Sequence, residues 1–310
     1  MKDYLSEIDE RFPIRNSKEQ KEAFRKWASA EAAKAGVEVW TEDNDGHSNL
    51  VFSDVSSADV IFTAHYDTPR RALLPNLMLV SNKVLYVLYH VGVELIAVIP
   101  AVAAAMLAYK LLGLDFNLIS NRLIIVAVYG AVCFGLFYLI MRGPANRRNR
   151  NDNTSGTAAV MTLVSSLKDV SGAAFILFDD EEKGKKGSKA FANDHPEIKE
   201  KTLVINLDCV GNGDTYVFLA HKGAENDPGF IKLKETMEKS GLNVRFYPCG
   251  KALMNSDQKS FDRGVGVCAC MYKKNVGYYT DRIHTARDTV ADPEIVLRLA
   301  DALRDFVGQK

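Results

Sequence analysis

The chain has 310 residues, with 39 basic and 39 acidic side chains and a formal net charge of zero. This length suffices for one large domain or two ordinary ones. Because the chain has no net positive charge, its overall composition gives no reason to expect a nucleic-acid partner. The five cysteines follow no regular framework, which favours a reducing compartment. Cys268 and Cys270 stand close together, but we expect their side chains to point to opposite faces of a strand and not to form a bridge.

The N-terminal segment is strongly charged and lacks the apolar stretch of a signal peptide, so we do not interpret it as one. Ser17 is expected to cap a helix that buries Phe24 and Trp27 and stops near Gly36. The segments "VEVW" and "NLVF" that follow are expected to be short strands.

Three apolar runs along the chain each end in polar residues: "ADVIFTAHYD", "GAAFILFDDEE" and "TLVINLDCVG". Strands of this kind are typical of a sheet that is covered on both faces. Helices are expected after Asp152 and again after Asp292, which has the position of an N-cap before Pro293. The alternation of strands and helices predicts an α/β domain with three layers.

Two long apolar runs, at about 84–112 and 118–141, interrupt this pattern. Each contains the roughly 20 residues that a membrane-spanning helix needs, and the link "GLDF" leaves room only for a tight turn. We therefore predict a transmembrane helical hairpin, kinked at Pro100 and with His90 and Glu94 as polar exceptions near one end. The alternative is a helical pair buried in a soluble core, which is disfavoured because soluble helices usually keep a polar face.

Basic residues are distributed unevenly around the hairpin. Only Lys110 and Arg122 lie near the turn. The flanks carry Arg70, Arg71, Lys83, Arg142, Arg147, Arg148 and Arg150. By the positive-inside rule, the flanks and the domain attached to them are expected in the cytoplasm. The sequence thus predicts a multi-pass protein of the inner, cytoplasmic membrane.

Histidines and carboxylates gather where strands or loops end: His65 and Asp67, Asp152, Glu181 and Glu182, Asp208, and His284 with Asp288. Each has an ordinary structural explanation, such as a turn residue or a solvated charge. Their joint pattern favours a site, because α/β folds bind ligands at the carboxyl ends of their strands. Zinc binds imidazole and carboxylate, and two metals held close together need a carboxylate that bridges them.

The segments "HYD", "NDNTSG", "FDDEEKGKKGS", "NLDCVG" and "IHTARDT" resemble, in order and local form, those of the M28 family of di-zinc peptidases. This family includes bacterial aminopeptidases and the catalytic domain of glutamate carboxypeptidase. The resemblance covers nearly the whole chain except the hairpin. It implies a three-layer αβα zinc-exopeptidase-like domain with a mixed central sheet, formed by residues 1–83 and 144–310, with the hairpin inserted at 84–143.

The resemblance also implies roles for individual residues. His65 and Asp208 would hold one zinc, Glu182 and His284 would hold the other, and Asp152 would bridge the two. Glu181 would be the general base, Asp67 would accept a hydrogen bond from His65 and fix its tautomer, and Asp288 would do the same for His284. Cobalt or manganese suits the same ligands.

The resemblance extends to the segment "SDQKSFDRGVGVCACMY", which would help to form the substrate pocket. Lys185 and Gln258 depart from the family pattern. Neither is a ligand position, so the departures concern the pocket and not the metals.

These implications describe a membrane-anchored di-zinc exopeptidase, most simply an aminopeptidase. Glu181 would take a proton from a water molecule between the metals, and the resulting hydroxide would attack the scissile carbonyl. A carboxypeptidase-like or glutaminyl-cyclase-like enzyme on the same scaffold stays open. So does a non-catalytic membrane scaffold or receptor, although the expected ligands and base are all present. The expected partners are a peptide substrate and the lipid bilayer. Members of the family often form oligomers, so a homo-oligomer stays open.

The interval between His65 and Asp152 is longer than the family's usual one, and the hairpin accounts for most of the excess. Both ends of the hairpin must then return to the face of the domain that carries the metal site. We therefore expect the active-site face to lie near the cytoplasmic surface of the membrane.

Overall fold

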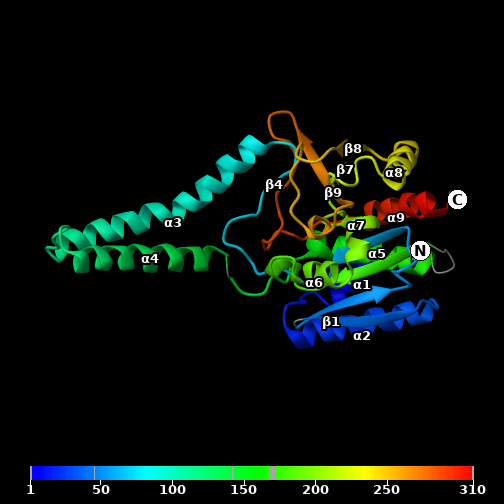
Figure 1. Ribbon diagram of the computed structural model, residues 1–310, viewed down its shortest axis with the longest axis horizontal. Helices are drawn as coiled ribbons and strands as arrows, with labels where there is room; N and C mark the ends of the chain where they lie inside the picture. The colour runs from blue at the N-terminus through cyan, green and yellow to red at the C-terminus, as the bar shows by residue number, and fades with distance from the viewer. Residues whose placement is uncertain (1, 45, 142, 168–171, 309–310) are drawn as a thin grey trace.

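The computed structural model describes residues 2–44, 46–141, 143–167 and 172–308. Its strands are β1 Val39–Asn44, β2 His47–Phe52, β3 Val60–His65, β4 Met78–Leu79, β5 Ala173–Phe178, β6 Leu203–Leu207, β7 Thr215–Ala220, β8 Val244–Tyr247, β9 Gly264–Lys273 and β10 Gly277–Thr280. Its helices are α1 Tyr4–Arg11, α2 Lys18–Lys34, α3 Lys83–Leu111, α4 Ile119–Met141, α5 Gly156–Ser166, α6 Lys186–Asp194, α7 Pro196–Lys201, α8 Pro228–Lys239 and α9 Pro293–Gly308. Figure 1 shows their arrangement.

The strands form one mixed sheet in the order β1-β2-β5-β3-β6-β9-β10-β4, with β7 beside β9 and β8 beside β7. The central strands β5, β3 and β6 run parallel, and β9 is parallel to β6. Antiparallel pairs flank them on both sides, between β2 and β5 and between β9 and β7. The predicted mixed α/β sheet is therefore confirmed.

Helices cover both faces of the sheet. Phe62 and Phe175 belong to a core that includes residues of α1, α2, α5, α8 and α9. Their strand neighbours Ile61 and Ile176 point the other way, into a smaller core with Phe191 of α6 and Ile198 of α7. Successive residues of a strand face opposite sides, so the continuous apolar runs supply both cores and the three layers follow.

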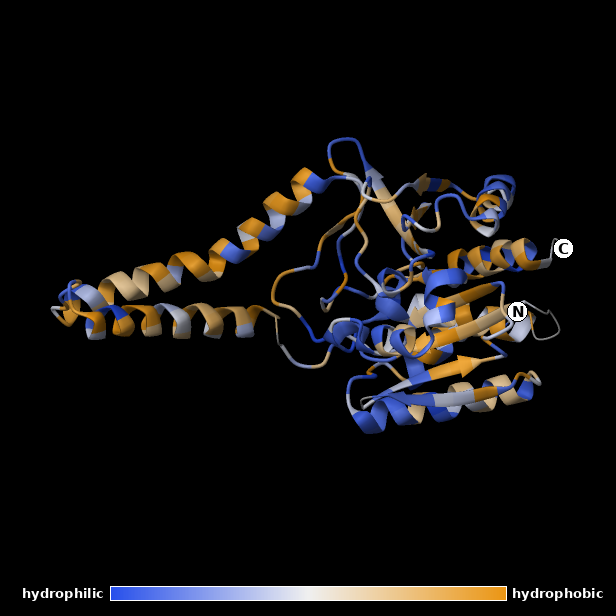
Figure 2. Cartoon of the chain, viewed as in Figure 1, coloured by the Kyte–Doolittle hydropathy of each residue, from blue (hydrophilic) through white to orange (hydrophobic). Residues whose placement is uncertain are grey.

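Helices α3 and α4 extend away from this body as a long arm (Figure 1) that is built mainly of hydrophobic residues (Figure 2). Their bounds lie within one residue of those expected. In the most apolar 18-residue stretch of each helix, only 17% of α3 and 11% of α4 is buried. The pair is therefore not part of a soluble core. Ala97, Ala101 and Ala105 form the buried stripe of α3, and small residues at this spacing let two helices approach closely. Both helices are candidate membrane spans.

The root of the hairpin is a pair of hydrogen-bonded chain segments. The N–H of Arg71 donates to the carbonyl of Pro144 at 2.9 Å, and the N–H of Gly143 donates back to Arg71 at 3.1 Å. A side chain at position 143 would begin 2.2 Å from the Arg71 carbonyl oxygen, so this close approach requires glycine. Arg142, one of the expected flanking charges, lies outside the described residues.

The side chains of Cys268 and Cys270 do not point to opposite faces, and that expectation was wrong. Residues two apart on a strand share a face, and the two Sγ atoms lie 3.5 Å apart in the core. Both are free thiols.

Candidate metal centre and active site

The carboxyl ends of the three central parallel strands carry four of the expected site residues. His65 is the last residue of β3, Glu181 and Glu182 follow β5, and Asp208 directly follows β6. Asp152 comes from a distorted turn, Arg150–Ser155, that leads into α5. His284 comes from the loop between β10 and α9. The structure therefore brings residues from five separate segments to one edge of the sheet.

Two groups of side chains meet at Asp152. In the first, Nε2 of His65 lies 3.4 Å from Oδ1 of Asp152 and 3.8 Å from Oδ1 of Asp208. In the second, Nε2 of His284 lies 3.1 Å from Oδ2 of Asp152 and 3.4 Å from Oε2 of Glu182. Within each group the nitrogen and oxygen atoms lie within 4.8 Å of one another. Asp152 thus turns one oxygen to each histidine.

The chemistry of these groups fits metal ions. Among the described residues, Oε1 of Glu182 and Oδ1 of Asp208 are buried and have no hydrogen-bond partner. A buried carboxylate oxygen is costly unless it is paired or binds a metal. Imidazole nitrogen with carboxylate oxygen is a donor set that zinc accepts. The residues present therefore fit a centre of two ions that share Asp152.

Asp67 supports both halves of the site. Its Oδ1 and Oδ2 accept the backbone N–H groups of Glu181 at 3.0 Å and Glu182 at 3.2 Å. Oδ1 also lies 3.4 Å from Nδ1 of His65. The hydrogen bond of Nδ1 of His65 goes to the backbone carbonyl of Asp67 at 3.2 Å, so the expected bond to the carboxylate stays a prediction. The contacts of the carboxylate with the Glu181–Glu182 turn were not expected.

Burial dominates the electrostatics of the glutamates. It raises the pKa of Glu181 well above its usual range, and the neighbouring carboxylates of Asp257 and Glu182 act in the same direction. Burial also raises the pKa of Glu182, to about 8. At Asp152 burial acts in the same way, but hydrogen bonds from His284 and His65 outweigh it and hold its pKa below the usual range. Of these three carboxylates, Asp152 therefore stays ionised to the lowest pH.

Asp288 does not hold His284 as expected. Its Oδ1 accepts the N–H of Asn151 and its Oδ2 accepts the N–H of Asp152, each at 3.0 Å. Both oxygens are therefore used to fix the backbone of the turn that presents Asp152. Asn153 fixes the same turn from the other side, because its side-chain amide donates to the carbonyl of Leu207 at 2.9 Å and accepts the N–H of Cys209 at 3.2 Å.

Arg15 is a site-supporting residue that the sequence did not indicate. It is fully buried, and its guanidinium donates to the carbonyl of Tyr66 and, at 3.1 Å, to Oγ1 of Thr154. These partners belong to the strand end with His65 and to the turn with Asp152. A positive charge in a charged N-terminal segment is ordinarily a surface feature, so no local signal could have placed Arg15 here.

Asp257 is a second residue near the site that the sequence did not indicate. It is fully buried, and burial raises its pKa to about 7. It lies in the segment expected to form the substrate pocket, next to Gln258. Gln258 is buried too, where it accepts a hydrogen bond from Nδ2 of Asn206 at 3.2 Å. Lys185, the other departure, is partly exposed and donates to Oδ1 of Asn255 at 3.1 Å.

A model of the family "Peptidase family M28" matches residues 145–307, which is more than half of the sequence. The chain belongs to peptidase family M28. The match begins after the hairpin and includes Asp152, Glu182, Asp208 and His284. Membership and fold together support a peptidase with a zinc-exopeptidase-like site.

Solved structures with this fold include enzymes of two kinds. The LapA aminopeptidase of Legionella pneumophila is similar with a TM-score of 0.57 and 14% identity, over 98% of this chain and 68% of that one. A leucine aminopeptidase precursor and a glutaminyl cyclase bound to N-acetylhistamine, both from Bacteroides thetaiotaomicron, each give a TM-score of 0.60 and 14% identity. Each match covers 99% of this chain and 95% or 96% of the other. At such identities the similarity concerns the fold alone.

Proposed function

We propose that this M28 protein is a membrane-anchored di-zinc aminopeptidase that releases N-terminal residues from peptides. The observation that carries the proposal is the pair of three-residue groups that share Asp152. A centre of two ions suits hydrolysis because it can hold both the attacking and the developing oxygen. When bound, zinc would polarise the scissile carbonyl.

The chain's own residues supply the proton transfers. The carboxylate of Glu181 lies in one group with His65 and Glu182, within 4.8 Å, and is assigned the general base. A raised pKa suits a carboxylate that takes a proton from water and returns it to the leaving amine. Asp67 keeps this carboxylate in place through the backbone of Glu181.

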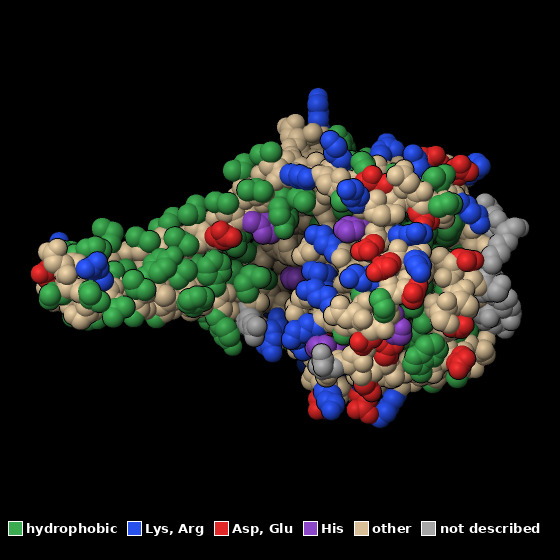
Figure 3. All heavy atoms as spheres, in the orientation of Figure 1, with side chains coloured by type: hydrophobic (Ala, Val, Ile, Leu, Met, Phe, Trp, Pro, Cys, Tyr) green, Lys and Arg blue, Asp and Glu red, His purple; other side chains and the backbone are tan. Residues whose placement is uncertain are grey.

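The apolar hairpin is proposed to anchor the protein, with the catalytic domain on the cytoplasmic side. The arm is covered by apolar side chains, whereas Lys and Arg side chains gather on the domain beside its root (Figure 3). Arg70, Arg71, Arg147 and Arg148 are exposed there. Arg150 does not contribute to this surface, because its guanidinium contacts Asp9 at 2.8 Å.

The Glu181→Gln variant tests the assigned base. We expect it to keep its zinc but to lose activity on aminoacyl reporter amides by about 10²–10⁴-fold, because the amide cannot accept the proton. Zinc content and kcat would be measured on the same preparation. Glu235→Gln, an exposed position on α8, is the matched control and should behave as wild type. Full activity of Glu181→Gln would reject the assignment.

Substrate comparison tests the type of reaction. The proposal expects cleavage of peptides with a free N-terminus and none of the same peptides after N-acetylation. Removal of the last residue from N-acetylated peptides would instead identify a carboxypeptidase. Cyclisation of N-terminal glutamine without hydrolysis would identify a glutaminyl cyclase, the activity named for one of the similar structures. A zinc-loaded protein that transforms none of them would be a non-catalytic scaffold.

A further inference from the structure

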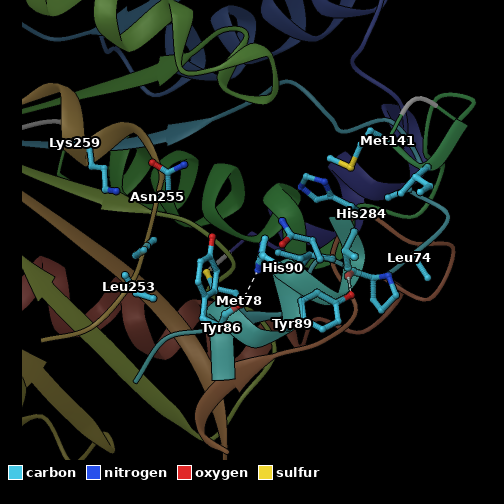
Figure 4. A pocket seen from close by; sticks show the side chains of 17 residues that line it. Leu74, Met78, Tyr86, Tyr89, His90, Met141, Leu253, Asn255, Lys259 and His284 are labelled. Carbon is cyan, nitrogen blue, oxygen red and sulfur yellow. Dashed lines mark hydrogen bonds between the residues drawn. The ribbon is translucent and has the colours of Figure 1, made fainter. Parts of the chain in front are cut away.

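A cavity of about 580 Å³ lies between the base of the hairpin and the candidate metal centre. His284 forms part of its wall at one end (Figure 4). Helix α3 contributes Tyr86 and Val93, and α4 contributes Ile140. The hairpin is therefore part of the cavity as well as an arm that leaves the domain.

The lining is mainly apolar. Besides the residues from the hairpin, Leu253 and Ile283 line it from the catalytic domain. Its volume falls in the range of about 300–1,000 Å³ that is typical of sites for small ligands. It exceeds the space of one side chain, so it can accept a bulky apolar group together with neighbouring atoms of a peptide.

The wall formed by the hairpin is fixed to the segment of the candidate ligand. The N–H of Ala72 donates to the carbonyl of His284 at 2.8 Å, and the N–H of Leu73 donates to the carbonyl of Ile140 at 2.9 Å. Residues 72 and 73 thus connect the end of α4 to the loop of His284. Because this short segment is bonded to both, it fixes the position of the cavity relative to the candidate metal centre.

Helix α3 has two apolar faces near its start. Val87 and Val91 are 56% and 44% exposed on the outer face, where the proposed bilayer would meet them. Tyr86 and Val93 are only partly exposed and line the cavity. Figure 1 shows α3 and α4 diverging as they approach the domain, so the inner face at this level is available to a ligand.

We propose that this cavity binds the bulky apolar side chain of a peptide residue next to the scissile bond, and that α3 and α4 are two of its walls. The inference rests on the proposed aminopeptidase function and names its substrate class: peptides with large apolar residues, such as Leu or Phe, at the cleaved end. The inserted hairpin thus determines specificity in addition to any anchoring.

Filling the cavity from the hairpin side tests the inference. Val93→Trp places a large side chain into the cavity, whereas Val91→Trp is the same change on the outer face of the same helix. We expect Val93→Trp to lower kcat/KM for Phe- and Leu-aminoacyl amides by about tenfold or more and for the Ala amide by less than about threefold, in line with the discrimination that apolar pockets provide. Val91→Trp should keep the wild-type ratio. An unchanged Phe-to-Ala ratio in Val93→Trp would overturn the inference.

Binding measurements separate this inference from the proposed function. Peptides whose first peptide bond is reduced to a methylene-amine, beginning with Phe or Ala, would be titrated calorimetrically into the zinc-loaded full chain in nanodiscs. A Phe preference that is lost in Val93→Trp supports the inference even if wild type cleaves nothing. Cleavage by wild type with no Phe preference refutes it while the proposed function stands. Tyr86→Ala, which removes an aromatic wall instead of adding bulk, should also weaken Phe binding if Val93→Trp does not fold.

Discussion

Asp152 is the residue on which the proposed chemistry depends most. One of its oxygens faces His65 and the other faces His284. Its backbone is fixed by Asp288, and its turn is joined to the segment of Asp208 by Asn153. This support fixes the backbone that presents the carboxylate between the two histidines, the position that a ligand bridging two ions requires.

The Asp152→Asn variant therefore should lose metal. An amide keeps one oxygen but replaces the other with a donor, so it cannot bind both ions, and we expect zinc to fall from two per chain to one or fewer. Elemental analysis of purified protein measures this directly. Asp194→Asn, at an exposed position, should retain the wild-type content. Two zincs bound by Asp152→Asn would contradict the bridging role.

Site residues differ in how far the sequence can indicate them. His65, Glu182 and Asp208 stand at the ends of apolar runs, so local pattern and chain order were enough to select them. Arg15 contacts Tyr66 and Thr154, which are 51 and 139 positions away in the sequence. No pattern in the sequence around Arg15 predicts those contacts. The predicted partner of Asp288 was wrong for the same reason. Its carboxylate oxygens accept hydrogen bonds from backbone N–H groups 136 and 137 positions away.

At the scale of elements, α2 is linked to the loop that carries the assigned base. Nζ of Lys21 lies 2.7 Å from Oδ1 of Asp179 and 2.6 Å from Oδ1 of Asp180, and all three side chains are buried. Glu181 follows directly. Burial disfavours the charge of Asp180, but hydrogen bonds from Lys21 and Lys183 outweigh it and lower its pKa to about 2.

Lys21→Met should destabilise the protein in a pH-dependent way. Removing one partner of a buried ion pair leaves uncompensated charge and costs about 3 kcal/mol of unfolding free energy near neutral pH. Because the pKa of Asp180 is lowered on folding, its contribution is present above its usual pKa near 4 and is lost as the pH falls towards 2. The difference between wild type and variant should shrink across that window.

Chemical denaturation in detergent, followed by the fluorescence of the buried Trp27, would measure this difference at several pH values. Lys26→Met removes the exposed pair with Glu22 and should change stability by less than about 1 kcal/mol. A Lys21→Met effect that stays constant from pH 7 to pH 2 would rule out the ion pair as its cause.

Elements were predictable where their own residues determine them. The helix after Ser17 has a complete capping box with Gln20, and β3, β5 and β6 are long, continuous apolar runs. Strand β4 has only two residues and exists through its pairing with β10. Strands β7 and β8 likewise complete the far side of the sheet through β9. Such elements depend on partners distant in sequence, which periodicity does not record.

At the scale of the whole molecule, the hairpin leaves and re-enters the domain beside the candidate metal centre. Hydropathy alone predicted its two helices, because length and apolar composition are local properties. Its contribution to a cavity was not predictable, since this depends on hydrogen bonds from residues 72 and 73 to His284 and Ile140. The division into a discontinuous peptidase domain and an insertion stays a prediction.

The proposed membrane topology of the hairpin provides the last prediction. Cys249 is exposed on the domain, whereas Cys133, Cys209, Cys268 and Cys270 are buried, so the protein has one native probe for a membrane-impermeant maleimide. A cytoplasmic domain predicts that Cys249 is protected in intact cells and is labelled after lysis. In a Cys249→Ser background, Asn117→Cys at the exposed tip of the hairpin should be labelled in intact cells, because both helices are long enough to cross the bilayer. The reverse pattern would place the domain outside, and protection of both sites in intact cells would mean that the arm does not cross.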